Sequence, residues 1–200
     1  LDGTGIIENC RADNLGGAIY LGKTSSTKGT VYIKNGSINN NSALNGNGGA
    51  FYLDGGDAYI SGGTLSNNKS LNGGGAYLAG GMLNITGGNI YANTATNGAG
   101  AYLAGGTLYA LGGIIDSNTA TNGGGAYLQG GILNVDGCSI SNNTAENGGG
   151  AYVSLGNIDM STGSFVNNTA SNDGGGVYLT GGNLTVIGGS FTNNKAANNG

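Results

Sequence analysis

The 200-residue sequence predicts an all-β fold, a single-stranded right-handed parallel β-helix with about 25 residues and three short strands per coil. Two markers that recur in phase predict it. The first is a tyrosine that recurs at spacings of 32, 25, 25, 25, 25 and 26 residues, at Tyr20, Tyr52, Tyr77, Tyr102, Tyr127, Tyr152 and Tyr178. The second is an apolar residue followed three positions later by an asparagine, at Asn9, Asn41, Asn68, Asn93, Asn118, Asn143, Asn168 and Asn194. Fixed periods of this size indicate a solenoid of stacked repeats.

One repeat, residues 75–99, justifies the three strands. Its pieces AYL, MLNI and NIYA are bounded by glycine pairs or by an asparagine–threonine cluster, which are turn signals. Apolar residues such as Leu78, Leu83 and Ile85 alternate within these pieces, so they share one face of a pleated strand. A single repeat cannot bury that face, whereas stacked repeats bury a continuous core. The right-handed coil follows from the handedness preference of parallel crossover connections.

We expect residues 1–200 to form one domain of seven to eight coils. Leu1 enters in the middle of a coil, and the sequence stops at Gly200 just before another strand of the GGAY type would begin. The segment is therefore expected to be a fragment of a longer repeat array. The 46 glycines fit this design because glycine pairs permit the sharp bend at each corner of a coil.

Charge and hydropathy exclude several partners. The net charge is −4 and only 8% of the residues are charged, which argues against a nucleic-acid partner, since nucleic acid demands a basic face. The apolar runs are only a few residues long, too short to span a membrane. Cys10 and Cys138 lie five repeats apart, so they are expected to be about 24 Å apart and to remain free thiols.

The two recurring columns are expected to be structural. An asparagine at a corner can hydrogen-bond the asparagines of the coils above and below, which forms an amide ladder. The tyrosines face outward, one above another, at about the 4.8 Å spacing of neighbouring strands. Their rings then cover each other's faces, which argues against the alternative, a glycan-binding platform.

No residue is predicted to be catalytic, and no metal or cofactor is predicted. The ten acidic residues occupy scattered positions within the repeat, and the chain has no histidine and no cysteine pair. Asp54 and Asp57 are the closest acidic pair, because they flank the two glycines of one corner. We expect that corner to be a solvated turn.

The 32-residue repeat marks a candidate partner contact. Five extra residues fall in the loop 22–29 and two more fall in 43–49. Insertions in solenoids map to surface loops that often form the binding face. The predicted contact residues are Lys23, Thr24, Ser25, Ser26, Thr27, Lys28 and Lys34.

Short motifs carry a family resemblance. GGAI at 16–19, FVNN at 165–168 and FTNN at 191–194 resemble the GGA-[ILV] and FxxN motifs of the polymorphic outer membrane protein repeat of bacterial surface proteins. Most repeats here carry GGAY or GAGAY instead of GGAI, and isoleucine or leucine often replaces the phenylalanine. The resemblance implies a right-handed β-helical passenger at a cell surface, commonly an adhesin and often exported as an autotransporter.

The leading functional hypothesis is a non-enzymatic extracellular stalk or adhesin at the cell surface, which binds a receptor on a host or neighbouring cell. The alternative is a self-assembling filament or sheath subunit, whose partners are copies of itself. The third hypothesis is a glycan-binding β-helix, which would use the outward tyrosines, or an ice-binding β-helix, which would use the TxT rows Thr94-Ala95-Thr96 and Thr119-Ala120-Thr121. Lys69, Glu146 and Lys195 fall in the same column and argue against a flat ice-binding array.

Overall fold

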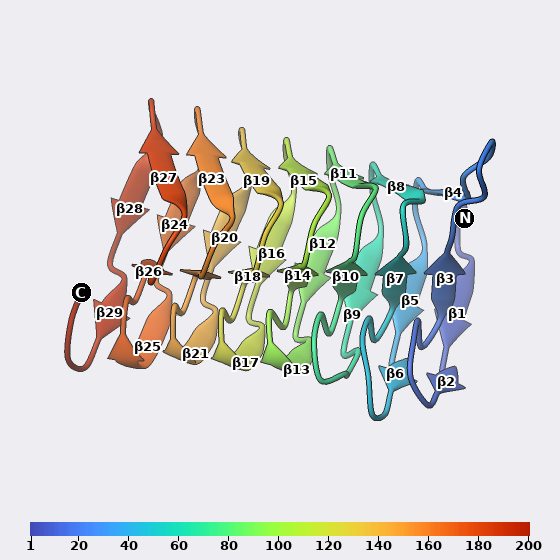
Figure 1. Cartoon of the computed structure of the whole chain (residues 1–200), viewed down its shortest axis with the longest axis horizontal. Helices are drawn as coiled ribbons and strands as arrows, with labels where there is room; N and C mark the ends of the chain where they lie inside the picture. The colour runs from blue at the N-terminus through green and yellow to red at the C-terminus, as the bar shows by residue number, and fades with distance from the viewer.

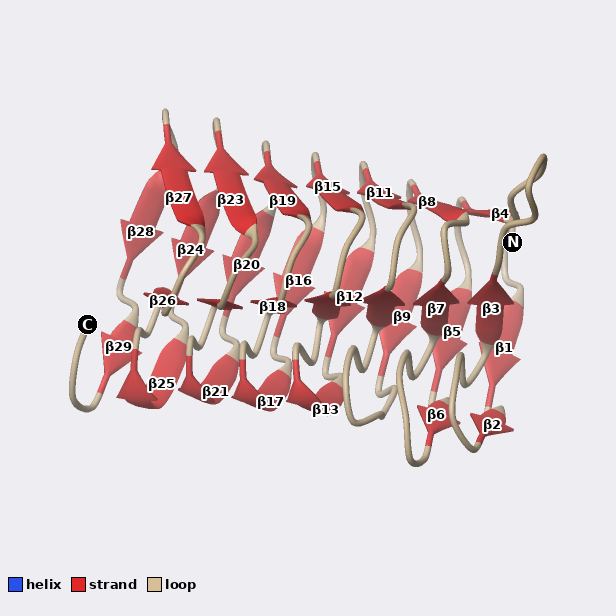
Figure 2. Cartoon of the chain, in the orientation of Figure 1, coloured by secondary structure: helices blue, strands red, loops and turns tan.

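The structure, a computed structural model, describes residues 1–200 as a rod of stacked coils. Every regular element is a β-strand, and the strands form parallel rows along the long axis, with the two termini at opposite ends (Figure 1). Loops join the strands at the corners of each coil (Figure 2). The predicted all-β fold class is confirmed.

Four parallel sheets run the length of the rod, and a coil passes through them in the order I, II, III, IV. Sheet I contains β3 (Ile19–Leu21), β7 (Phe51–Leu53), β10 (Ala76–Leu78), β14 (Ala101–Leu103), β18 (Ala126–Leu128), β22 (Ala151–Val153) and β26 (Val177–Leu179). Sheet II contains β4 (Thr30–Ile33), β8 (Asp57–Ile60), β11 (Met82–Ile85), β15 (Thr107–Ala110), β19 (Ile132–Val135), β23 (Asn157–Met160) and β27 (Asn183–Val186).

Sheet III is the longest. It contains β1 (Ile6–Glu8), β5 (Ser37–Asn39), β9 (Thr64–Ser66), β12 (Asn89–Tyr91), β16 (Ile114–Asp116), β20 (Ser139–Ser141), β24 (Ser164–Val166) and β28 (Ser190–Thr192). Sheet IV contains β13 (Thr94–Asn97), β17 (Thr119–Asn122), β21 (Thr144–Asn147), β25 (Thr169–Asp173) and β29 (Lys195–Ala196). The pair β2 (Arg11–Ala12) and β6 (Ser42–Ala43) continues sheet IV through single bridges at Lys69.

The expectation of three strands per coil is wrong, because sheet IV adds a fourth. Its strands are the asparagine–threonine segments that sequence composition assigns to turns, such as Thr94-Ala95-Thr96-Asn97. Thr94 pairs with Thr119, and Ala95 pairs with Ala120, in the next coil. A near-identical segment directly above supplies the missing hydrogen-bond partners, and threonine is itself favourable in strands. Stacking therefore turns this polar corner into a narrow sheet.

The coil is right-handed. In Figure 1 the chain rises through sheet I on the near side, crosses the top in sheet II and descends through sheet III on the far side. While it turns in this sense it advances from the N-terminus at the right to the C-terminus at the left. This is the handedness that parallel crossover connections favour.

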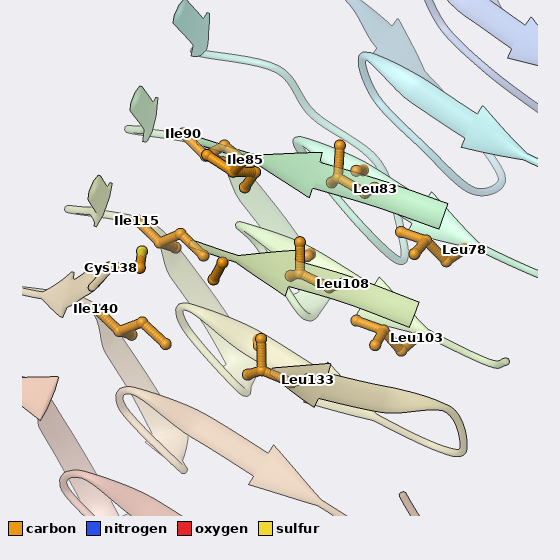
Figure 3. Close-up of a cluster of buried hydrophobic side chains, with 14 of the residues drawn as sticks. Leu78, Leu83, Ile85, Ile90, Leu103, Leu108, Ile115, Leu133, Cys138 and Ile140 are labelled. Atoms are coloured by element: carbon orange, nitrogen blue, oxygen red, sulfur yellow. The ribbon is translucent and has the colours of Figure 1, made fainter. Parts of the chain in front are cut away.

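The core fills the space between the sheets. A cluster of 30 buried apolar residues runs along the rod, and alternation within each short strand selects its members. Leu83, Leu108 and Leu133 form one column on neighbouring strands of sheet II (Figure 3). Ile90 and Ile115 belong to a second column, on sheet III. Each coil therefore buries its apolar face against the coils on both sides, as the sequence pattern predicts.

Backbone geometry at the corner between sheets III and IV is also repeated. One non-glycine residue per coil has a positive φ there, for example Asn142 at 52° and Asn167 at 54°. Asparagine tolerates the left-handed region better than most residues, because its short side chain hydrogen-bonds locally. Residues 1–200 form no helix that could span a lipid bilayer.

Candidate functional site

The column of asparagines that follows sheet III is a buried hydrogen-bonded ladder. The Oδ1 of Asn93 accepts from the backbone N–H of Asn68 at 2.9 Å and from its Nδ2 at 3.1 Å. The Nδ2 of Asn93 donates to the Leu65 carbonyl at 3.1 Å and to the Oδ1 of Asn118 at 3.0 Å. The members of this inner ladder are Asn41, Asn68, Asn93, Asn118, Asn143, Asn168 and Asn194. Because these amides bond one another and the backbone, the ladder holds the fold together and offers little to a ligand.

Asn9, which the sequence marker places in the ladder, lies outside it. Ile7 pairs with Ile38, so Cys10 takes the ladder position in the first coil. The Cys10 backbone N–H donates to the Oδ1 of Asn41 at 2.9 Å. Asn9 instead occupies the left-handed corner position, with φ of 58°. The prediction for Asn9 was off by one residue because two adjacent isoleucines, Ile6 and Ile7, both fit the apolar position of the repeated pattern.

A second asparagine ladder was missed by sequence analysis. It lies where sheet IV ends, and its members are Asn47, Asn72, Asn97, Asn122, Asn147, Asn172 and Asn198. In this outer ladder the Nδ2 of each asparagine donates to the preceding coil, as Asn97 does to the Oδ1 of Asn72 at 2.8 Å. The inner ladder donates toward the following coil, so the two amide ladders run in opposite directions. The recurring asparagine just before the glycine run, as in NGGGA, is the signal that could have identified it.

The tyrosine column on sheet I is a continuous stack. Its ring centroids lie 4.9 to 5.3 Å apart, and the first five pairs are within 8° of parallel. Only the last pair, Tyr152 and Tyr178, meets edge to face, at 65°. Burial, followed by the neighbouring tyrosines Tyr127 and Tyr77, raises the pKa of Tyr102 to about 12. Because the rings cover one another's faces, this column contributes to packing and leaves little open ring surface for a sugar.

The five extra residues of the long repeat form a β-hairpin between β3 and β4. Lys23 and Lys28 face each other in an antiparallel bridge at its base. At its tip the Thr24 N–H donates to the Thr27 carbonyl at 2.6 Å, and the two threonine hydroxyls lie 2.8 Å apart. The insertion therefore has a defined turn of its own.

The hairpin is anchored to a buried carboxylate. Asp57, at the start of β8, is only 4% exposed and forms an ion pair with Lys28. A hydrogen bond to Asp57 raises the pKa of Lys28, against the opposing effect of desolvation. The expectation of a solvated turn is therefore wrong for Asp57, because the inserted residues cover it. Asp54 accepts a hydrogen bond from the Tyr20 hydroxyl at 2.8 Å.

The structure separates Lys34 from the other predicted contact residues. It follows β4, at the strand's far end from the hairpin, and its Nζ lies 3.7 Å from the Asp2 carboxylate. Two tyrosines flank the hairpin instead: Tyr20 on the strand that enters it is 50% exposed, and Tyr32 on the strand that leaves it is 56% exposed. We call residues 22–29 together with Tyr20 and Tyr32 the hairpin surface. It combines two lysines, four serine and threonine residues at the tip and two amphipathic rings.

Acidic residues and cysteines do not gather elsewhere. No group of three or more histidine, cysteine, aspartate or glutamate side chains is close enough to hold a metal ion. Cys10 and Cys138 are both free, as expected from their separation along the stack. Burial raises the pKa of the Cys138 thiol to about 12.

Comparison of the sequence with known families found one repeat type that it resembles. The family model of the Chlamydia polymorphic membrane protein repeat matches residues 162–180. The matched segment holds the FVNN motif at 165–168 and the glycine run that leads into β26. The resemblance expected from the motifs is thereby confirmed for this repeat, and the β-solenoid fold agrees with it. No match was found among curated proteins or among solved structures.

Proposed function

We propose that this chain is a non-enzymatic, extracellular segment of a cell-surface protein, and that it adheres to a receptor on a host or neighbouring cell through the hairpin surface. The match of one repeat to a family named for membrane proteins supports the surface location. The observation that carries the adhesive role is the hairpin itself. It is the largest departure from the regular coil, and the pair formed by Lys28 and Asp57 fixes it in place.

The physical advantage of this arrangement is preorganisation. A disordered insertion loses conformational freedom when it binds, and that loss reduces affinity. Here the bridge between Lys23 and Lys28 and the contacts between Thr24 and Thr27 already order the loop. Tyrosine is also enriched among the residues that dominate binding energy at interfaces. Tyr20 and Tyr32 lie on the strands that enter and leave the hairpin, so they are placed to add contacts beside it.

A bead adhesion assay tests the proposal. Fluorescent beads coated with the chain are applied to epithelial cell monolayers. In the test variant a single alanine replaces residues 23–28, which restores the three-residue turn found between β10 and β11 at 79–81. Asp57→Asn accompanies the replacement, because the same sheet position holds an asparagine, Asn157, in another coil. A control variant, Lys69→Ser with Lys195→Ser, removes the same number of lysines from sheet IV.

We expect the hairpin variant to lose adhesion and the control variant to retain it, with unchanged β-sheet circular dichroism in both. Adhesion by the hairpin variant at the level of the unmodified chain would contradict the proposal. Clumping of coated beads in the absence of cells would instead favour the self-assembling filament, with copies of the chain as partners.

A further inference from the structure

A shallow groove of about 540 Å³ lies on the outer face of sheet III, away from the hairpin surface. It spans four neighbouring strands, β9, β12, β16 and β20, so it follows the axis of the rod. The residues that give it its chemical character are Asn89, Tyr91, Ile114, Asp116 and Asn142. None of them belongs to a column that sequence analysis singled out.

Tyr91 presents an open aromatic ring in this groove. Its neighbours along the column are Ser66 and Asp116, so no ring of an adjacent coil stacks on it. This contrasts with Tyr77, whose ring lies between those of Tyr52 and Tyr102. Tyr91 is 36% exposed and Ile114, on the next strand, is 40% exposed. The groove therefore offers an uncovered ring face and an apolar side chain on the mostly polar outer face of the sheet.

Asp116 is a fixed hydrogen-bond acceptor beside the ring. Its Oδ1 accepts from the Ser141 hydroxyl at 2.7 Å and from the Asn142 Nδ2 at 2.7 Å. Its Oδ2 accepts from the Ser117 hydroxyl at 2.6 Å. Burial raises the pKa of Asp116, but these three hydrogen bonds outweigh it and hold the pKa below its ordinary value. A carboxylate has about four acceptor sites, so about one remains for a ligand hydroxyl.

We propose that this groove binds an uncharged hexose polysaccharide whose chain runs along the rod. The C–H face of a sugar ring can pack on Tyr91 and Ile114, while its hydroxyls bond Asp116 and the amides of Asn89 and Asn142. Successive coils are about 4.8 Å apart, close to the length of one hexose unit, so neighbouring sugars meet equivalent positions on successive strands.

The charges of the groove select the glycan class. No lysine or arginine lines it, and its one carboxylate repels the carboxylates of acidic glycans. Asp116 is also the only carboxylate in the groove, whereas glycoside hydrolysis ordinarily requires a pair that flanks the scissile bond. The groove is therefore suited to holding a glycan rather than cleaving it. This site does not depend on the hairpin surface, and the hairpin variant retains it.

Isothermal titration calorimetry of the full chain tests the site. The probes are hexasaccharides of β-1,4-linked glucose, β-1,4-linked mannose and α-1,4-linked glucose, with a galacturonic acid hexasaccharide as the acidic comparison. The test variants are Tyr91→Ser and Asp116→Asn. The control is Tyr109→Ser, because Tyr109 likewise has no aromatic neighbour in its column, where it lies between Asn84 and Asn134, but it is on sheet II. Circular dichroism establishes that each variant is folded.

We expect at least one neutral hexasaccharide to bind with a Kd of about 1 mM or tighter. Tyr91→Ser and Asp116→Asn should each weaken that binding about tenfold, the effect of losing one well-placed contact, while Tyr109→Ser leaves it unchanged. The proposal is overturned if no neutral hexasaccharide binds, or if galacturonate binds as tightly as the best neutral glycan. Unchanged affinity in Tyr91→Ser would overturn it as well.

Discussion

The Nδ2 of Asn93 donates to the Oδ1 of Asn118, one coil further along the rod, at 3.0 Å. The same Oδ1 accepts a hydrogen bond from the backbone N–H of Asn93 at 3.0 Å, so one side-chain oxygen satisfies two donors of the preceding coil. Repeated along the chain, this relationship joins each coil to the next at the corner between sheets III and IV, where the Thr119 N–H also donates to the Asn93 carbonyl at 3.0 Å. The hydrogen bonds of the inner ladder therefore fix the alignment of each coil on the next along the whole stack.

Asn118→Ala should therefore destabilise the chain far more than Asn122→Ala. The first variant leaves the buried backbone N–H of Asn93 and one hydrogen of its Nδ2 without an acceptor, which costs about 4 kcal/mol of unfolding free energy. Asn122, in the outer ladder, is partly exposed, so water replaces its lost partners and the cost stays below about 1 kcal/mol. Urea unfolding monitored by circular dichroism measures both. Equal costs would contradict the different roles of the two ladders.

The ladders also show which parts of the fold can be predicted from the sequence and which cannot. The period and the alternation of apolar residues are enough to predict the coil, its parallel pairing and its core, because these depend on positions that every repeat shares. The fourth strand was missed because Thr94-Ala95-Thr96-Asn97 has the composition of a turn when it is considered alone. Its strand character comes from the coil next to it. Asn9 was misplaced because a pattern with two adjacent isoleucines does not determine register.

Alkaline pH should weaken the fold through the tyrosine stack. Burial raises the pKa of Tyr102 to about 12, while in the unfolded chain a tyrosine titrates near its ordinary value of 10.0. A pKa that is higher in the folded state contributes stability below pH 10, and this contribution is lost as the pH rises from 10 toward 12. Urea midpoints measured across this range should fall, and Tyr102→Phe should make the decline shallower. An unchanged slope in that variant would contradict the assignment to Tyr102.

Two glycines at different corners of the coil should respond oppositely to alanine. A Cβ at Gly125 would lie 2.5 Å from the Gly150 carbonyl oxygen and 2.9 Å from the Ile140 Cγ2, so the coils would have to move apart. Gly125→Ala is expected to cost at least about 2 kcal/mol of unfolding free energy. At Gly80 the nearest atom to an added Cβ lies 3.6 Å away, so Gly80→Ala should stabilise by about 0.5 kcal/mol through the unfolded chain. Thermal and urea unfolding of the two variants provide the check.

Removing either partner of the ion pair beneath the hairpin should destabilise the fold by a different amount. Lys28→Met removes the cation that pairs with the Oδ2 of the buried Asp57 carboxylate. The Oδ1 of Asp57 has no hydrogen-bond partner either, so the whole charge is then left buried and unpaired. Asp57→Asn leaves only a lysine that remains largely in water, at 56% side-chain exposure. The urea midpoint should therefore fall more in Lys28→Met than in Asp57→Asn, and the double variant should resemble Asp57→Asn. A larger fall in Asp57→Asn would show that the pair does not anchor the hairpin as described.

The surface chemistry was harder to predict than the fold, for a physical reason. The insertion was visible in the sequence as extra length, but the burial of Asp57 depends on the hairpin folding over it. Tyr91, Asp116 and Asn142 are 25 and 26 residues apart along the chain and become neighbours only through the strand register. Regular columns can be predicted because every coil repeats them. A binding site formed by exceptions in successive coils requires the exact stacking.

Distances between paired spin labels on sheet III test the stacked coil most directly. One label is placed at Ser37 and the other at Ser139, Ser164 or Ser190, which lie four, five and six coils away in the same sheet column. With both native cysteines replaced, double electron–electron resonance should give backbone separations of about 19, 24 and 29 Å, a linear rise of about 4.8 Å per coil. Broad distributions, or separations that do not rise linearly with coil number, would contradict the fold on which every proposed surface depends.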